Sequence, residues 1–254
     1  MRWDGVAVPR DEGTVSDCKV IIVEGGIGSG KTELSQELAA AMTAASGLPT
    51  VLLLEPTTQD EVGGANPYLT DYYADQRRWA FVMQVHLLQE RFRMHLEAQW
   101  YAMAGRGHAV VDRSVYGDVS FLELQRRDGH VDDREYRTYK RLYATMTAFV
   151  RLPSVCLRLL VDPAVAARRI DERASRVAGR KCESVIEVGY LQRLDEEIDQ
   201  VVRELQLGGV TIMDVHWDQD RPDTGARQEA VRALAFRILR IGDPALRHLH
   251  RRRM

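Results

Sequence analysis

The fold of this chain is decided by the stretch Val20-Ile21-Ile22-Val23-Glu24-Gly25-Gly26-Ile27-Gly28-Ser29-Gly30-Lys31-Thr32. Its β-branched start predicts a buried strand, and Gly25-x-x-x-x-Gly30-Lys31-Thr32 has the spacing of a phosphate-binding loop. Helix-forming residues follow at once, so a helix N-terminus would also point at a bound phosphate. A glycine-rich turn with a purely structural role would need neither the lysine nor the threonine.

This loop predicts binding of a nucleoside triphosphate. Its glycines let successive backbone N–H groups turn towards phosphate oxygens. Lys31 would reach the β- and γ-phosphates, and Thr32 would offer its hydroxyl to Mg²⁺. The predicted nucleotide-binding residues of the loop are Gly25, Gly26, Ile27, Gly28, Ser29, Gly30, Lys31 and Thr32.

Composition predicts a soluble, cytoplasmic protein. The 254 residues are 45% hydrophobic, which is enough for a sizeable core, and the net charge of −2 argues against a general nucleic-acid or membrane-surface binder. No apolar run is long enough to span a membrane, and residues 1–17 lack the apolar core of a secretion signal. The three cysteines are widely spaced and show no disulfide or zinc pattern, which favours a reducing compartment.

Strand and helix patterns alternate along the chain. Such alternation predicts an α/β fold, in which a five-stranded parallel sheet is covered by helices on both faces. We expect one domain over residues 18–241, a flexible arm at 1–17 and a basic tail at 242–254. The strands are expected at 20–23, 51–54, 109–111, 155–161 and 210–215, and the main helices at 32–45, 74–104, 132–150, 187–207 and 226–241, with a further helix starting at Asp162-Pro163. Residues 57–72 are expected to form a polar loop.

Acidic residues follow the second and third predicted strands. Ligands bind outside the carboxyl ends of strands in an open parallel sheet, so Glu55 and Asp112-Arg113 are expected beside the phosphate loop. Phosphoryl transfer needs a carboxylate that accepts the proton of the attacking hydroxyl, and Glu55 is the candidate, although it could simply cap a turn. Asp112 is predicted to coordinate Mg²⁺, directly or through water; a plain salt bridge to Arg113 is the alternative.

A run of arginines and lysines at 168–181 is predicted to form a lid. Its cations, particularly Arg176 and Arg180, would close on the phosphates and offset negative charge in the transition state, with Gly179 as a hinge. The alternative is a solvated helix face followed by a loop. We call residues 168–181 the lid segment.

Several matches in one order show that the chain resembles the deoxynucleoside kinases over roughly residues 19–215. After the phosphate loop come Leu54-Glu55-Pro56, similar to the family's strand-end Glu-Pro, and Arg78-Trp79-Ala80-Phe81-Val82-Met83-Gln84, similar to its Arg-Trp-x-Phe-x-x-Gln. Asp112-Arg113-Ser114 stands where the family has Glu-Arg-Ser or Asp-Arg-Ser. The motif Arg180-x-x-Glu183-x-x-Ile186, followed by Tyr190-Leu191, resembles the family's lid and the helix after it.

The resemblance implies roles for individual residues. Glu55, helped by Arg113, would take the proton from the 5′-hydroxyl of a deoxynucleoside as ATP donates its γ-phosphate. Gln84 would make a paired amide contact with the base, while Tyr73 and Glu183 would hold the sugar 3′-hydroxyl. The plainer alternatives are a loop aromatic for Tyr73, a surface amide for Gln84 and a first-turn acid for Glu183.

Arg91 and Asp118 bear on the choice of base. In the purine- and cytosine-preferring members, an Arg seven residues after the Gln meets an Asp four residues after the Ser, near the base. Arg91 and Asp118 occupy these positions, which thymidine-preferring members do not fill in this way. The resemblance therefore implies deoxyadenosine, deoxyguanosine or deoxycytidine as the acceptor. A plain salt bridge between the two residues is the alternative.

The sequence departs from the family pattern in two places. The family often has a Trp shortly after the Glu-Pro, whereas Thr57-Thr58-Gln59-Asp60 contains none, so one wall of the pocket is left unassigned. The lid is also longer between its arginines than the family pattern leads us to expect.

Two other functions compete with a deoxynucleoside kinase. A thymidylate-type nucleotide kinase shares the loop, the Glu-Pro-like turn and the Asp-Arg pair, but a Glu lies where the acceptor's phosphate would be. A regulatory NTPase without a small acceptor would need a water-positioning residue and a strand-end Asp in a hydrophobic run, which Val110-Val111-Asp112 could imitate. The family also pairs helices between subunits, so the apolar helices at 74–104 and 132–150 imply a homodimer. Binding to nucleic acid through the short basic tail is the weakest alternative.

Overall fold

The computed structural model describes residues 18–55, 66–218 and 224–242. Several features named in the sequence analysis lie outside these residues: the arm at 1–17, the tail from 243 onwards, Pro56 of the Glu-Pro motif, and residues 57–65 of the expected polar loop, which include the segment 57–60 that lacks the family's tryptophan.

The centre of the fold is a parallel sheet in which β1 lies in the middle. The strand order is β2-β3-β1-β4-β5, and all neighbouring strands are parallel. After β3 the chain crosses from one side of β1 to the other to form β4, so the loop after β1 lies where ligands bind in such sheets. The strands are β1 (Val20–Glu24), β2 (Thr50–Leu53), β3 (His108–Asp112), β4 (Val155–Leu160) and β5 (Thr211–His216).

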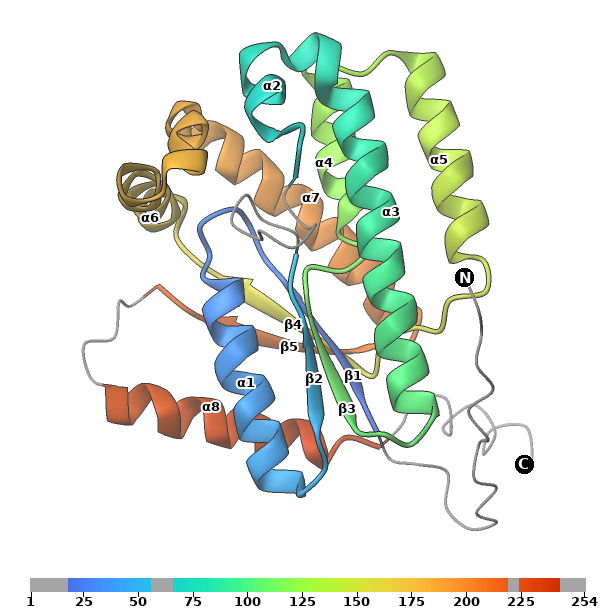
Figure 1. Ribbon diagram of the computed structural model, residues 1–254, viewed down its shortest axis with the longest axis vertical. Coiled ribbons are helices and arrows are strands. Elements are labelled where there is room, and N and C mark those ends of the chain that lie inside the picture. The colour runs from blue at the N-terminus through green and yellow to red at the C-terminus, as the bar shows by residue number, and fades with distance from the viewer. Residues whose placement is uncertain (1–17, 56–65, 219–223, 243–254) are drawn as a thin grey trace.

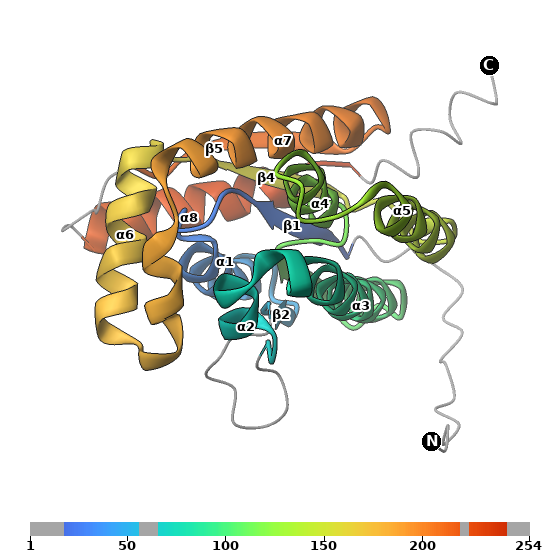
Figure 2. The same cartoon turned by 90° about the horizontal axis from the view of Figure 1, so that it is seen from above.

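Helices cover both faces of the sheet (Figures 1 and 2). Two helices, α1 and α8, pack together on one face, and α3, α4 and α7 cover the other, with α5 beside α3. The helices are α1 (Lys31–Ser46), α2 (Leu69–Ala74), α3 (Gln76–Met103), α4 (Asp118–Arg127), α5 (Asp133–Thr147), α6 (Pro163–Arg176), α7 (Val188–Leu207) and α8 (Thr224–Leu239), with a 3-10 helix η1 (Ala178–Val185) between α6 and α7.

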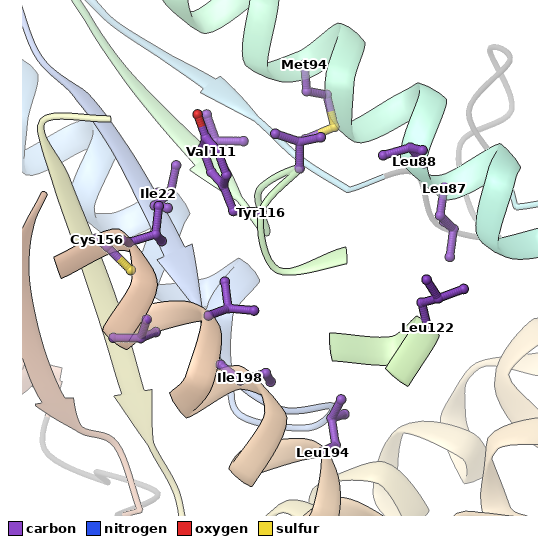
Figure 3. Close-up of a cluster of buried hydrophobic side chains, with 14 of the residues drawn as sticks. Ile22, Leu87, Leu88, Met94, Val111, Tyr116, Leu122, Cys156, Leu194 and Ile198 are labelled. Carbon is purple, nitrogen blue, oxygen red and sulfur yellow. The ribbon is translucent and has the colours of Figure 1, made fainter. Parts of the chain in front are cut away.

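Alternate residues of the central strand enter two separate cores. Ile22 is fully buried on the face of the sheet that α3, α4 and α7 cover, in the apolar cluster of Figure 3, which also contains Leu122 and Ile198. Its neighbours Ile21 and Val23 face α1 and α8. A strand buried on both faces reads as a continuous apolar run, and this is why Val20–Val23 predicted a buried strand.

The sequence-based fold class is confirmed, and the structure refines its boundaries. The polar loop expected over 57–72 is wrong at its end, because α2 begins at Leu69, after Asn66 Oδ1 accepts a hydrogen bond of 3.0 Å from the Tyr68 N–H. Helix α3 begins after α2 rather than continuing it, since the Asp75 side chain caps α3 by accepting from the Arg78 N–H at 3.0 Å. No helix within the described residues is long and apolar enough to cross a bilayer.

Candidate active site

The phosphate loop joins β1 to α1 through two glycines in left-handed conformations. Gly28 and Gly30 have φ of 76° and 83°, and Gly30 caps the N-terminus of α1. A Cβ at Gly28 would lie 2.5 Å from the carbonyl oxygen of Ala166, so both the backbone angle and the close approach of α6 favour glycine there.

Lys31 is folded back over the loop. Its Nζ donates to the Gly26 carbonyl oxygen at 2.7 Å and to Ser29 Oγ at 3.3 Å, and the residue is 7% exposed. Burial, reinforced by the nearby Arg113 charge, lowers the pKa of Lys31 to about 7. Phosphate oxygens would compensate this cation better than the two neutral acceptors that now hold it.

Thr32 and Asp112 bring a hydroxyl group and a carboxylate together beside the phosphate loop. Thr32 Oγ1 donates to Asp112 Oδ2 at 2.6 Å, and the other carboxylate oxygen, Oδ1, is buried without a hydrogen-bond partner in the described ranges. Burial raises the pKa of Asp112. Arg113, the alternative partner of Asp112, forms its ion pair with Glu55 instead. A hydroxyl and an uncompensated carboxylate oxygen fit Mg²⁺, which prefers a few carboxylates together with substrate phosphates.

Glu55 lies two residues beyond β2 between two guanidinium groups. Arg113 Nε donates to its Oε2 at 3.2 Å and Arg91 Nε to its Oε1 at 3.1 Å, with a further contact from Arg91 Nη2. Burial alone would raise the pKa of Glu55, but the two arginines, Arg91 first, lower it to about 2. The carboxylate is therefore ionised and held at both oxygens.

Arg91 also contacts Asp118, as the sequence predicted, and both residues are buried. The amide nitrogen of Gln84 donates to the backbone oxygen of Asp118 at 2.9 Å and to its Oδ2 at 3.0 Å. Both amide hydrogens are therefore used, and Oε1 of Gln84 is the group available to a ligand. The hydroxyl of Tyr139, a residue of α5, also donates to Asp118 Oδ2.

The lid segment is joined to Glu183, just beyond it. Glu183 is 3% exposed and accepts from Arg173 Nη2 at 2.7 Å and from Arg180 Nη1 at 2.5 Å. Tyr73 lies near this cluster, and burial raises the pKa of its phenol, assisted by Tyr190 and Glu183. A bound phosphate would compete with Glu183 for the two guanidinium groups.

One cavity, partly open to solvent, is lined by most of the predicted site residues. Its walls include Ile27, Gly28, Lys31, Thr32, Glu55, Tyr73, Gln84, Arg91, Asp112, Arg113, Arg180 and Glu183. Asp118 is fully buried behind Gln84 and Arg91, which it contacts. Arg176 ends α6 as an exposed residue and does not line this cavity. Its role stays a prediction.

Sequence reasoning missed several residues of the site. Arg173 lines the cavity one helical turn before Arg176, and only the arginine-rich composition of the lid segment pointed to it. Phe121 lies under both arginines of Glu55, with the Cζ of Arg113 4.7 Å and that of Arg91 5.5 Å from its ring centre. Tyr139 comes from a helix remote in sequence, and no local pattern marked it.

Comparison with known proteins agrees with this geometry. A family model described as deoxynucleoside kinase matches residues 21–233. The deoxyguanosine kinase of Dictyostelium discoideum is 32% identical over 200 residues, which are 79% of this chain and 64% of that protein. The deoxyadenosine kinase of the same organism is 30% identical over 199 residues, 78% of this chain and 72% of that protein. The match thus spans slightly less than two thirds of the first relative.

A solved structure supports the fold. Deoxyadenosine kinase from M. mycoides with bound dATP superposes with a TM-score of 0.63 at 21% identity, covering 85% of this chain and 98% of that one. The family match covers most of the chain and includes every residue of the cavity described above. The chain belongs to the deoxynucleoside kinase family.

Proposed function

We propose that the protein transfers the γ-phosphate of ATP to the 5′-hydroxyl of a deoxynucleoside. The observation that carries this proposal is the position of Glu55, which shares a cavity with Lys31 of the phosphate loop and is fixed at both oxygens by arginines. A phosphate cradle, a proton acceptor and surrounding cations are the components that phosphoryl transfer to a hydroxyl requires.

The loop and Lys31 bind the phosphates in this proposal. Thr32 and Asp112 would hold Mg²⁺ through the threonine hydroxyl and the carboxylate, and the ion would supply positive charge that offsets the charge of the phosphates. Arg180 and Arg173 give up some of their hydrogen bonds with Glu183 and contact the transferred phosphoryl group instead. Because the cations lie in a partly enclosed cavity, their interaction with negative charge is stronger than in water.

Glu55 accepts the proton of the attacking hydroxyl. A pKa of about 2 makes it a weak base, but it also keeps the carboxylate ionised at every physiological pH. Phosphoryl transfer has a loose transition state with little need for early proton removal, so a well-placed acceptor is sufficient. Arg113, 3.2 Å from Glu55, holds the acceptor in position.

Gln84 and the Arg91–Asp118 pair recognise the base. Oε1 of Gln84 accepts a hydrogen bond, so it favours a base with an amino group, as in adenine or cytosine. The Dictyostelium relatives are named deoxyguanosine and deoxyadenosine kinases. We propose a purine deoxynucleoside or deoxycytidine as the acceptor, with Tyr73 and Glu183 at the sugar 3′-hydroxyl.

A single assay tests this function against its two competitors. On the acceptor side of the cavity, Glu55 and Glu183 each already occupy two arginines, so a phosphate on the acceptor would have to compete with a carboxylate for them. We expect turnover of deoxyadenosine to exceed that of its monophosphate, with little ATP hydrolysis in the absence of either. Faster use of the monophosphate indicates a nucleotide kinase, and hydrolysis unaffected by any nucleoside indicates an NTPase.

We further propose that two chains associate through α3 and α5. These neighbouring helices and the loop after α5 expose large apolar side chains, which is the usual mark of an interface. The exposed residues are Trp100, Met103, Leu142, Phe149 and Leu152. A cytoplasmic location is part of the proposal and is supported by the cysteines, none of which forms a disulfide in the described part of the chain.

A further inference from the structure

The central strand β1 ends in a carboxylate, Glu24, which has no part in the reaction proposed above. Glu24 is 0% exposed. Its Oε1 accepts two hydrogen bonds from one residue, from the Ser114 N–H at 2.9 Å and from the Ser114 hydroxyl at 2.5 Å. A buried carboxylate that accepts paired hydrogen bonds fixes its partner strongly, since hydrogen bonds to a charged group are stronger than neutral ones.

Ser114, which Glu24 holds, in turn binds the backbone at the start of α4. Its Oγ accepts from the Tyr116 N–H at 3.1 Å and from the Gly117 N–H at 3.4 Å, while its own proton goes to Glu24. Gly117 is the N-cap of α4 and offers no side chain to the helix. The next residue is Asp118, which binds Arg91 and Gln84 at the base end of the cavity.

On its other side Ser114 follows a strained residue. Arg113 has φ of 65° and is the one non-glycine residue with a positive φ among those the structure describes. Its N–H is held by the Val23 carbonyl oxygen at 3.1 Å. A long side chain in this conformation persists only where the surrounding contacts over-determine it, and such residues gather at functional sites. This conformation accompanies the contact between Arg113 and Glu55.

The Glu24 carboxylate is also confined sterically. A Cβ on Gly117 would collide with Glu24 Oε2, so the α4 turn packs directly on that oxygen. Oε2 has no hydrogen-bond partner within the described ranges. The position of the carboxylate is therefore set by its contact with the turn from Ser114 to Gly117.

We propose that Glu24 is a positioning residue which acts through Ser114. By holding this one serine it fixes Arg113 at the proton acceptor and Asp118 at the base pocket. This inference rests on the proposed roles of Arg113 and Asp118. It adds the residue that keeps these two side chains in fixed positions relative to each other. A disturbance of Glu24 should therefore impair turnover and base choice together, with a smaller effect on ATP binding, because its charge is the weakest of those that act on Lys31.

The test is a double-mutant cycle of Glu24→Gln and Ser114→Ala, read out as kcat, as KM for ATP, and as the ranking of the deoxynucleosides. Each single variant should lower kcat about tenfold, from the loss of charge-assisted hydrogen bonds, with KM for ATP within about twofold. Because both changes break the same link, the double variant should also fall only about tenfold rather than about a hundredfold. The preference for amino-bearing bases over thymidine should shrink in all three.

Two variants serve as matched controls. Glu197→Gln changes a buried glutamate of α7, and Ser120→Ala removes a buried hydroxyl of α4 that has no partner in the described residues. Neither residue lines the active cavity, so both should retain the wild-type kcat and base ranking.

Gly117→Ala tests the inference by disturbing Glu24 without replacing it. Its new methyl group pushes on Glu24, and it should reproduce the loss in kcat even if Glu24→Gln fails to fold.

Three results would overturn the inference: additive losses in the cycle, a fall in ATP affinity and thermal stability in proportion to kcat, or Gly117→Ala with wild-type turnover. Glu55→Gln in the same assay separates this failure from that of the proposed function. If Glu55→Gln keeps full turnover, the assigned catalytic roles fail. If it loses turnover while the cycle is additive, only the role of Glu24 fails.

Discussion

Arg91 binds Glu55, with its Nε 3.1 Å from Oε1 of the carboxylate, and the same guanidinium contacts Asp118 through Nη1. One cation therefore joins the proposed proton acceptor to the proposed base-reading carboxylate. A change at either end alters the charge environment of the other, because the guanidinium is 2% exposed and its interactions are little screened by water. Base recognition and phosphoryl transfer are thus physically linked in this site.

Removal of the Arg91–Asp118 pair should weaken the enzyme's preference among the bases. With Arg91→Ala and Asp118→Ala combined, we expect the preference for deoxyadenosine over thymidine, measured as the ratio of kcat/KM values, to fall at least about tenfold, because the polar groups that disfavour the wrong base are gone. Both changes are made together so that neither charge is left buried and unpaired. The control is Arg93→Ala on the exposed face of the same helix. An unchanged ranking would remove the pair from the base pocket.

Glu55→Gln should separate nucleotide binding from turnover. The amide keeps the size of the side chain but accepts a proton far less well, so we expect kcat to fall about 10²- to 10⁴-fold while the affinity for ATP stays near its wild-type value. Single-turnover kinetics and equilibrium binding of ATP measure the two effects. Glu97→Gln, an exposed change on α3, is the matched control. Equal turnover in Glu55→Gln would contradict the assignment.

The pKa of Glu55 also predicts how stability changes with acid. The folded pKa of about 2 lies below the ordinary 4.5, so between these values the unfolded chain binds a proton that the folded chain does not. The ion pairs of Glu55 therefore stabilise the fold fully above about pH 4.5, and this contribution is lost as the pH falls towards 2. The difference in unfolding free energy between wild type and Glu55→Gln should shrink to less than about half between pH 7 and pH 3. Urea unfolding at both pH values measures this difference, and a constant difference would show that Glu55 is not ion-paired in solution.

The sequence predicted the parts of the site that have a local signature. The phosphate loop, Glu55 and Asp112 each follow an apolar strand, and the parallel order β2-β3-β1 brings those strand ends together as expected. Tyr139 and Glu24 were missed because their roles depend on contacts between elements distant along the chain, α5 with α4 and β1 with the turn after β3. Tyr139 looks like an ordinary core residue, and Glu24 like the residue that leads into the phosphate loop, until the packing is known.

Asp112→Asn should weaken the site for the metal. The amide can still accept the hydrogen bond from Thr32, 2.6 Å from Oδ2 in the wild type, but it lacks the charge that Mg²⁺ prefers in a ligand. We expect the concentration of Mg²⁺ needed for half-maximal activity to rise at least about tenfold, with a smaller fall in kcat at saturating Mg²⁺. Titration of activity with Mg²⁺ at fixed ATP measures this, and Asp214→Asn on the exposed side of β5 should show no change. A Mg²⁺ dependence identical to wild type would exclude Asp112 as a ligand.

The apolar surface on α3 and α5 predicts the oligomeric state. Trp100 is 65% exposed near the end of α3 and Phe149 is 93% exposed just after α5, so both leave apolar area in water that a second copy would bury. We expect light scattering to give twice the chain mass for the wild type and a shift towards the monomer for Trp100→Glu combined with Phe149→Glu, since charge in an interface core disfavours association. Phe236 on α8 is 54% exposed and lies on the opposite face of the sheet, where α1 and α8 pack, so Phe236→Glu is the matched control and should leave the dimer intact. If the wild type is a monomer, or if the Phe236 variant alone dissociates, the interface does not lie on α3 and α5.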